Sequence, residues 1–120
     1  MENKELVSRI VTSLDKHKAE NIQIIGVTDL TSIADYFVIA NGSSSTQVKS
    51  LSDYVQDELE QEGVHPPRVE GYASASWVLL DYGSVVVHVF TQEARSFYDL
   101  ERLWKDGHQL DVQEFLTNEG

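Results

Sequence analysis

Two stretches of the chain carry apolar residues at the three- and four-residue spacing of an amphipathic helix. The first lies within residues 2–19 and runs from Leu6 to Leu14, and the second spans about residues 45–62. This spacing places the apolar side chains along one face of each helix and the polar ones on the other. Gly63 is well placed to end the second helix.

Shorter apolar runs predict strands. Residues 22–27 and 35–40 are each predicted to form one. The second run is continuously apolar, which indicates a strand covered on both faces. Residues 68–71 predict a further short strand near a sheet edge, because Pro66 and Pro67 precede it.

Residues 76–90 predict a β-hairpin with a tight turn at Tyr82-Gly83, which would place Trp77 opposite His88. Side chains alternate along a strand, so the hairpin has two unlike faces. The first face is aliphatic and consists of Val78, Leu80, Val85, Val87 and Val89. The second face is mixed and consists of Trp77, Leu79, Asp81, Ser84, Val86, His88 and Phe90. A slip of the register by one residue would exchange the two faces.

The remaining pattern completes a mixed α/β fold. Residues 93–104 have apolar positions at helical spacing, which predicts a helix in one or two pieces, and residues 106–120 predict a short terminal helix with a frayed end. The order α-β-β-α-β-β-β-α contains a strand–helix–strand passage that should form a right-handed crossover. We therefore expect a mixed β-sheet with flanking helices in a single domain over residues 1–120, with its core at about 3–108 and a tail at 109–120.

The net charge of the chain limits which classes of partner it is expected to bind. The 120 residues include 20 acidic and nine basic side chains, which gives a formal net charge of −11. Such a surface repels the phosphate backbone of nucleic acids, and the basic residues are scattered rather than clustered. The charge suits a basic protein partner, whose approach it would accelerate, and it serves solubility equally well.

Composition also excludes several kinds of site. The chain has no cysteine, which excludes disulfides, thiol catalysis and cysteine-ligated zinc. None of its four histidines is spaced like a metal pair on one helix or strand. The first residues lack the apolar core of a secretory signal, and no apolar run approaches the length of a membrane span. We therefore expect a cytoplasmic protein without a metal site.

Gly42 and Ser43 stand between a predicted strand and a predicted helix, where backbone N–H groups are able to bind phosphate. They resemble the Gly-Ser element of nucleotidyltransferases, which also need two or three carboxylates on nearby strands to hold magnesium. The corresponding strand offers Asp81 alone, and the Walker and dinucleotide glycine patterns are missing. We therefore favour a capped strand-to-helix turn and expect no cofactor.

Trp77 and His88 each allow two interpretations. The aliphatic run after Trp77 suits a core residue, whereas the polar residues on its face suit an exposed anchor for a partner. His88 is either a satisfied structural histidine or a residue that orients the Trp77 indole, pairs with Asp81 or meets a partner's group. A Ser-His-Asp hydrolase would need an elbow turn and an oxyanion hole, of which the sequence gives no sign, so we expect no catalytic residues.

Four spaced motifs resemble one protein family. They lie at residues 35–40 (DYFVIA), 42–48 (GSSSTQV), 77–90 (WVLLDYGSVVVHVF) and 95–104 (RSFYDLERLW). In this order they are similar to the ribosomal silencing factors, the RsfS/Iojap group that includes the bacterial YbeB proteins. The resemblance covers most of residues 5–108.

The resemblance implies a nucleotidyltransferase-like fold that lacks the enzymes' carboxylates and is therefore catalytically degenerate. It implies binding to protein fourteen of the L series on the large ribosomal subunit, on the face that meets the small subunit. Occupying that face would sterically block subunit joining and repress translation when nutrients are short. Similar proteins are commonly dimers, so the resemblance also implies a homodimer.

We expect the mixed face of the hairpin to make this contact, because its apolar members would exclude water. The hypothesis places the centre of the contact at Trp77, Leu79, Asp81, His88 and Phe90. It places the margin at Tyr82, Arg95 and Tyr98. Neither nucleic-acid reading nor membrane binding is expected.

Two alternatives stay open at this point. The first is a working nucleotidyltransferase or nucleotide-binding domain that uses Gly42 and Ser43. The second is a factor that acts only during biogenesis of the large subunit, a role to which organelle relatives are linked.

Overall fold

A six-stranded sheet in the order β3-β4-β5-β2-β1-β6 forms the centre of the computed structural model, which describes residues 1–116. The strands are β1 (Glu20–Gly26), β2 (Tyr36–Gly42), β3 (Arg68–Glu70), β4 (Trp77–Asp81), β5 (Val85–Thr91) and β6 (His108–Leu110). Strands β2 and β5 run parallel, and the other neighbouring pairs are antiparallel. The predicted mixed α/β architecture is thereby confirmed.

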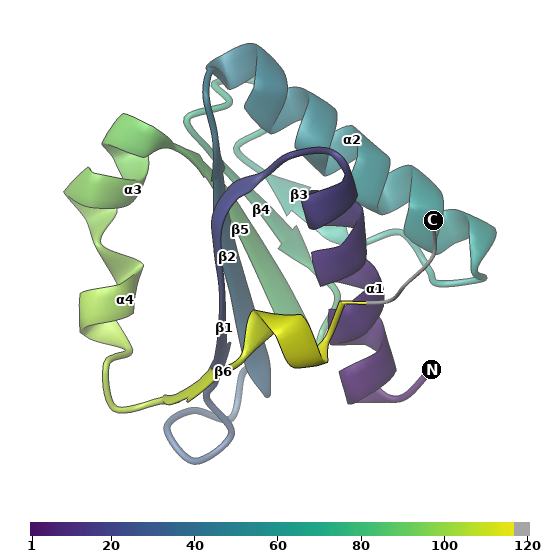
Figure 1. The fold of residues 1–120 in the computed structure, drawn as a ribbon, viewed down its shortest axis with the longest axis vertical. Coiled ribbons are helices and arrows are strands. Elements are labelled where there is room, and N and C mark those ends of the chain that lie inside the picture. The colour runs from purple at the N-terminus through teal and green to yellow at the C-terminus, as the bar shows by residue number, and fades with distance from the viewer. Residues whose placement is uncertain (117–120) are drawn as a thin grey trace.

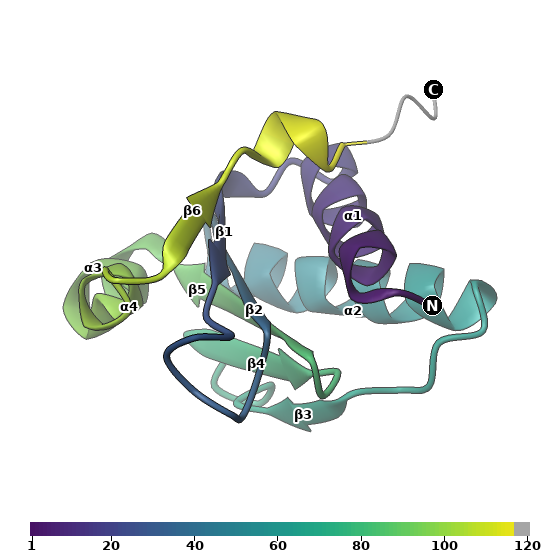
Figure 2. The same ribbon diagram turned by 90° about the horizontal axis from the view of Figure 1, so that it is seen from below.

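Two long helices cover one face of the sheet. Helices α1 (Asn3–Lys16) and α2 (Ser45–Gln61) lie together on this side, as Figures 1 and 2 show from two directions. Their apolar stripes are buried with the spacing that the sequence predicts, at Leu6, Val7, Ile10, Val11, Leu14, Val48, Leu51, Val55 and Leu59. They pack on an almost wholly aliphatic sheet surface, so removal of apolar area from water stabilises this side.

The turn between β2 and α2 is capped as predicted. The hydroxyl of Ser44 accepts a hydrogen bond from the backbone N–H of Gln47 at 3.1 Å. Helix α2 ends just before Gly63, whose φ is +81°. Strand β2 is buried from Phe37 to Gly42, which confirms the prediction of a strand covered on both faces.

The hairpin of β4 and β5 has a different register from the predicted one. Trp77 pairs with Phe90 and not with His88, and the two loop residues are Gly83 and Ser84 rather than Tyr82 and Gly83. Gly83 has a φ of +90°, a conformation that glycine adopts without steric cost and tyrosine does not. The correction moves the pairing by two positions, so the aliphatic and mixed faces stay as predicted.

Two short helices lie on the opposite side of the sheet (Figure 1). Helix α3 (Gln92–Tyr98) starts at Thr91, whose hydroxyl accepts from the N–H of Ala94 at 3.2 Å. Asp99 then adopts a left-handed conformation with φ of 48°, and α4 (Leu100–Leu103) follows. The helix predicted over residues 93–104 therefore forms in two pieces. Phe97, near the end of the first piece, is 81% exposed, although its helical spacing suggested an apolar position packed on the sheet.

The C-terminal region differs from the prediction. Residues 108–110 form an edge strand against β1 instead of part of a helix, and Leu110 packs beside the aliphatic core. A short 3-10 helix, η1 (Val112–Glu114), follows. The predicted frayed end falls on residues 117–120, outside the described residues. Within residues 1–116, no helix combines the length and apolar composition that crossing a membrane requires.

Candidate partner-binding face

Strand β4 presents a partly uncovered surface on the side of the sheet that carries α3 and α4. Helix α3 packs on β5 and β2, whereas Trp77, Leu79 and Asp81 of β4 are only partly buried. Tyr98 of α3 adjoins the Trp77 ring and is 48% exposed. We call the surface formed by Trp77, Leu79, Asp81 and Tyr98 the open face.

The edge strand β3 extends this surface with charged side chains. Arg68 pairs with Asp81 and Glu70 pairs with Leu79 in the antiparallel ladder, so both charged residues lie on the same side of the sheet as the open face. Their side chains form an exposed ion pair with 3.8 Å between Arg68 Nε and Glu70 Oε2. The open face therefore combines an apolar centre with a polar, charged edge, as protein-binding surfaces commonly do.

Three neighbouring aromatic side chains hold Trp77 in place. Its ring stacks on Phe90 with centroids 5.0 Å apart, and its centroid lies 4.7 Å from that of Tyr98. The indole N–H donates a hydrogen bond to Nδ1 of His88 at 3.0 Å. The sequence allowed either a core tryptophan or an exposed anchor, and the structure shows a half-buried ring with a fixed orientation.

His88 and Phe90 lie beneath the open face and not in it. His88 is 5% exposed and Phe90 is fully buried, so neither presents side-chain surface to a partner. Burial lowers the pKa of His88 to about 4, which keeps the imidazole neutral near pH 7. Because Nδ1 accepts the indole N–H, the proton of the neutral ring resides on Nε2. Of the interpretations that the sequence allowed, the structure supports the histidine that orients the indole.

Arg95 is a buried structural residue and not a margin residue of the open face. It is 8% exposed, and it donates to the side-chain oxygen of Asn41 at 2.9 Å and to the backbone oxygen of Asn21. Its Nε also pairs with Glu101 Oε2 at 3.2 Å. These contacts join α3 to β1, β2 and α4, so the guanidinium fixes how α3 and α4 sit on the sheet.

Asp81 and Tyr82 at the end of β4 face opposite ways. Asp81 lies on the side of the open face, and its Oδ1 accepts the N–H of Gly83 at 2.8 Å, which closes the hairpin turn. Tyr82 packs against the aliphatic core on the other side of the sheet, and burial raises the pKa of its hydroxyl. The structure therefore separates Tyr82 from the margin that the sequence assigned to it.

The sequence did not reveal two exposed apolar residues on α3 and α4, of which Phe97 contacts Tyr98 of the open face. Phe97 at the end of α3 is 81% exposed, and Leu103 at the end of α4 is 70% exposed. Residues 97–104 contain Phe97, Tyr98, Leu100, Leu103 and Trp104. So many apolar positions cannot all lie on the one buried face of a short helix, so some of them had to be exposed. This pattern could have revealed the two residues from the sequence.

Comparison with known proteins decides the family. The family model described as "ribosomal silencing factor during starvation" (RsfS) matches residues 1–120. The ribosomal silencing factor RsfS of Halalkalibacterium halodurans is 37% identical over 117 residues, which cover 98% of this chain and 100% of the relative. The RsfS of Zymomonas mobilis is 42% identical over 108 residues, which cover 89% of this chain and 81% of the relative. The chain belongs to the family of ribosomal silencing factors. This confirms the resemblance of the four motifs.

A solved structure supports the same membership. The crystal structure of a Chromobacterium violaceum protein superposes with a TM-score of 0.85 at 37% sequence identity, and the match covers 92% of each chain. The chain therefore has the same arrangement of sheet and helices as this crystal structure.

The side chain of Gln47, from the first turn of α2, occupies the turn that follows β2. The side-chain oxygen of Gln47 accepts hydrogen bonds from both the backbone N–H and the hydroxyl of Ser43. A Cβ added to Gly42 would meet the same Gln47 oxygen at 3.2 Å. The N–H and hydroxyl of Ser43, two donors that could face a phosphate in a nucleotide-binding turn, are therefore already engaged within the chain.

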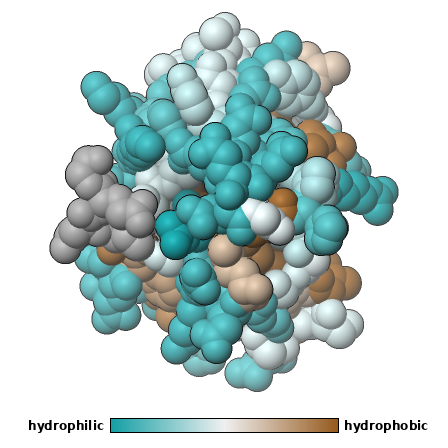
Figure 3. Space-filling model, turned by 90° about the vertical axis from the view of Figure 1, so that its right-hand side faces the viewer, coloured by the Kyte–Doolittle hydropathy of each residue, from teal (hydrophilic) through white to brown (hydrophobic). Residues whose placement is uncertain are grey.

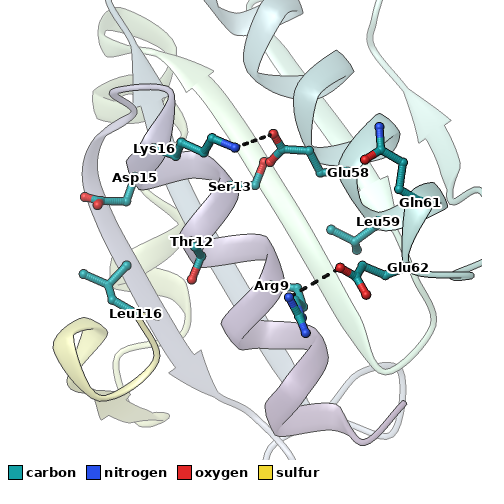
Figure 4. A pocket seen from close by; sticks show the side chains of 10 residues that line it. All are labelled: Arg9, Thr12, Ser13, Asp15, Lys16, Glu58, Leu59, Gln61, Glu62 and Leu116. Atoms are coloured by element: carbon teal, nitrogen blue, oxygen red, sulfur yellow. Dashed lines mark ion pairs between the residues drawn. The ribbon is translucent and has the colours of Figure 1, made fainter. Parts of the chain in front are cut away.

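A recess lies between α1 and α2, on the side of the molecule where hydrophilic residues dominate the surface (Figure 3). It has a volume of about 420 Å³. Arg9 faces Glu62 at 3.5 Å and Lys16 faces Glu58 at 3.5 Å across it (Figure 4). These ion pairs link α1 to α2 across the recess, so we interpret it as a polar gap between two packed helices rather than as a ligand site. The described residues contain no cluster of three or more potential metal ligands.

Proposed function

We propose that the chain represses translation in the cytoplasm by binding protein fourteen of the L series on the large ribosomal subunit. The bound protein sterically blocks joining of the large and small subunits when nutrients are short. Membership of the silencing-factor family over residues 1–120 is the observation that carries this proposal. The open face supplies a surface that suits such a contact.

The energetics of the contact follow from the open face. Trp77 and Leu79 form an apolar centre that is accessible without unfolding, and Tyr98 adds an exposed aromatic ring beside them. Tryptophan and tyrosine are the residue types that most often dominate binding energy when a partner covers them. His88 and Phe90 support the centre from below and would not touch the partner.

Charge would act mainly on the rate of encounter. The net charge of −11 attracts a basic surface over distances comparable to the Debye length, which is about 8 Å at physiological ionic strength. Asp81 places one carboxylate at the edge of the apolar centre. The mechanism is steric, and it requires no bond to be made or broken.

A sedimentation experiment tests the proposal. Purified large and small subunits are mixed with and without the protein, and joined ribosomes are separated from free subunits. We expect the wild type to deplete joined ribosomes, and Trp77→Ala or Leu79→Ala to do so about tenfold less well. The matched control is Val69→Ala, which removes an exposed apolar side chain from the opposite side of the adjacent strand.

Each alternative gives a different result in this experiment. A factor that acts only during biogenesis would leave mature subunits free to join and would bind precursor particles instead. Binding of nucleotide triphosphate with magnesium at micromolar concentration, measured by calorimetry, would support a nucleotide-binding domain. A homodimer that pairs two open faces would compete with the ribosome, so analytical ultracentrifugation should show that Trp77→Ala weakens it in parallel.

A further inference from the structure

We propose that His88 is a positioning residue that fixes the Trp77 indole in the orientation in which it meets the partner. This inference rests on the proposed function for its biological meaning, since it concerns how the open face is prepared for binding. The contact between the two side chains is a property of the isolated protein and is testable without any partner.

The contact is diagonal across the hairpin. Trp77 lies opposite Phe90 and His88 lies opposite Leu79, so the indole must reach two positions along the neighbouring strand. Diagonal neighbours on one face of an antiparallel pair are within reach of long aromatic side chains. The hydrogen bond from Nε1 of Trp77 to Nδ1 of His88 uses this reach and sets the rotation of the indole about its side-chain bonds.

His88 is itself held firmly enough to act as a reference point. It is 5% exposed, and its ring meets Phe37 edge-to-face with centroids 5.2 Å apart. Phe37 in turn contacts Trp104 edge-to-face at 5.1 Å. A side chain fixed in this way imposes its position on the more exposed Trp77 rather than following it.

A fixed indole lowers the cost of binding. An exposed side chain that is free to rotate loses that freedom when a partner covers it, and this loss of conformational entropy weakens binding. Phe90 and Tyr98 restrict the tilt of the indole by ring contact, and His88 restricts its rotation by a directional bond. The partner would therefore meet a surface that is already organised.

Two variants separate positioning from simple packing. His88→Asn keeps an acceptor oxygen at the δ position, where His88 carries the nitrogen that accepts the indole N–H. His88→Leu has a similar volume and no acceptor. Both lose the imidazole, so a difference between them reports the hydrogen bond and not the loss of the ring.

The first measurement is the indole ¹⁵N–¹H signal of Trp77 by NMR. The chain has two tryptophans, and Trp104→Phe identifies which signal belongs to which ring. We expect His88→Leu to move the Trp77 signal upfield and to speed its hydrogen exchange about tenfold, whereas His88→Asn keeps both near the wild type. A Trp77 signal that is the same in both variants and the wild type would overturn the inference.

The second measurement is affinity for isolated protein fourteen of the L series. We expect His88→Leu to weaken binding about tenfold and His88→Asn to stay within about threefold of the wild type. In a Trp77→Phe background, which lacks the indole N–H, His88→Leu should have no further effect. Equal losses in the two backgrounds would show that His88 acts independently of Trp77, and would also overturn the inference.

Failure of the proposed function gives a distinct pattern. If wild-type protein does not bind the ribosomal protein or the large subunit, the proposed function fails while the NMR comparison still decides the role of His88. If the wild type binds and both His88 variants bind equally well, the positioning role fails while the proposed function stands. Denaturation curves of each variant confirm that the folded state is populated during the assays.

Discussion

The two sides of the sheet differ in the chemistry of their side chains and in how far helices cover them. The side under α1 and α2 is aliphatic, and its described core residues include buried valines, leucines and isoleucines from both helices and four strands. The side under α3 and α4 also has buried aliphatic residues, but it adds aromatic rings, a buried histidine and a buried arginine. On the first side long helices cover the sheet, and on the second α3 packs on β5 and β2 while Trp77 and Leu79 stay partly exposed.

Under the proposed function, this difference separates the residues that stabilise the domain from those that bind the partner. Aliphatic packing is non-directional and strong, and it needs no polar partner inside. The aromatic side uses directional contacts, such as the Trp77–His88 hydrogen bond and the Arg95 contacts with Asn41 and Glu101. Directional contacts fix where a few side chains sit, which a binding surface needs and a core does not.

Leu80 and Leu79 offer the sharpest test, because they are adjacent in β4 and point to opposite sides of the sheet. Leu80 is fully buried, so Leu80→Ala should lower the free energy of unfolding by about 2 to 5 kcal/mol. Leu79→Ala should cost less than about 1.5 kcal/mol and should instead weaken binding to the proposed partner. Urea denaturation and the sedimentation assay measure the two effects. Equal destabilisation by both variants would remove the distinction between the two sides.

The alternation of side chains along β4, on which this test depends, is predictable from the sequence. Period-two patterning in β4 and β5 and the helical spacing in α1 and α2 identify most of the core residues from the sequence alone. The hairpin register was not readable, because side-chain alternation is unchanged when the pairing moves by two positions. The positive φ of Gly83 and its hydrogen bond to Asp81 suit the observed loop, whereas the predicted loop placed tyrosine at the first loop position.

As the pH falls, the free energy of unfolding should decrease through His88 at a higher pH than through Glu58. The pKa of His88 is about 4 in the folded protein and ordinarily about 6.5, so the unfolded chain takes up the proton first as the pH falls. Stability from this group is complete above about pH 6.5 and decreases down to about pH 4, by about 3 kcal/mol in total.

The control for this prediction is His88→Asn. Denaturation curves from pH 7 to pH 4 should lose stability less steeply in the variant than in the wild type. Glu58 between α1 and α2 acts in a lower range: burial raises its pKa, but the hydrogen bond and charge of His17 outweigh this and hold it below 4.5, so its contribution falls only under that pH. Parallel curves for wild type and variant between pH 6.5 and pH 4 would contradict the burial of a neutral His88.

Gly71 should be the least replaceable glycine near the open face. Its φ is +79°, and an added Cβ would lie 2.1 Å from the backbone oxygen of Trp77, which cannot move without disturbing β4. Gly71→Ala should therefore destabilise the protein by at least about 2 kcal/mol and shift the Trp77 indole signal. The matched control is Gly63→Ala, whose φ of +81° is similar but whose Cβ would meet nothing within 4 Å. It should cost about 1 kcal/mol. Similar costs for the two variants would show that the Trp77 backbone accommodates the methyl group.

The positions of the site residues were less predictable than the fold. Alternation placed Trp77, Leu79 and Asp81 on one side correctly, but it carries no information on what covers that side. The burial of His88 follows from α3 and the rings around it, which pack only in three dimensions. Arg95 reads as a surface residue on a helix because its partner Asn41 lies 54 positions away in the sequence.

The smallest expected effect concerns charge at the open face. Asp81→Asn removes one negative charge and keeps an oxygen able to accept the N–H of Gly83, so the hairpin turn should survive. Association with a basic partner should slow about two- to threefold at low salt, and the difference should vanish at high salt because mobile ions screen exposed charges. Glu60→Gln on exposed α2 makes the same change in net charge far from the open face and should slow association less. Stopped-flow measurements of the association rate, over a range of salt concentrations, compare the two variants. Equal slowing by the two variants would mean that the whole negative surface steers the encounter and that a charge at the open face contributes no more than one on α2.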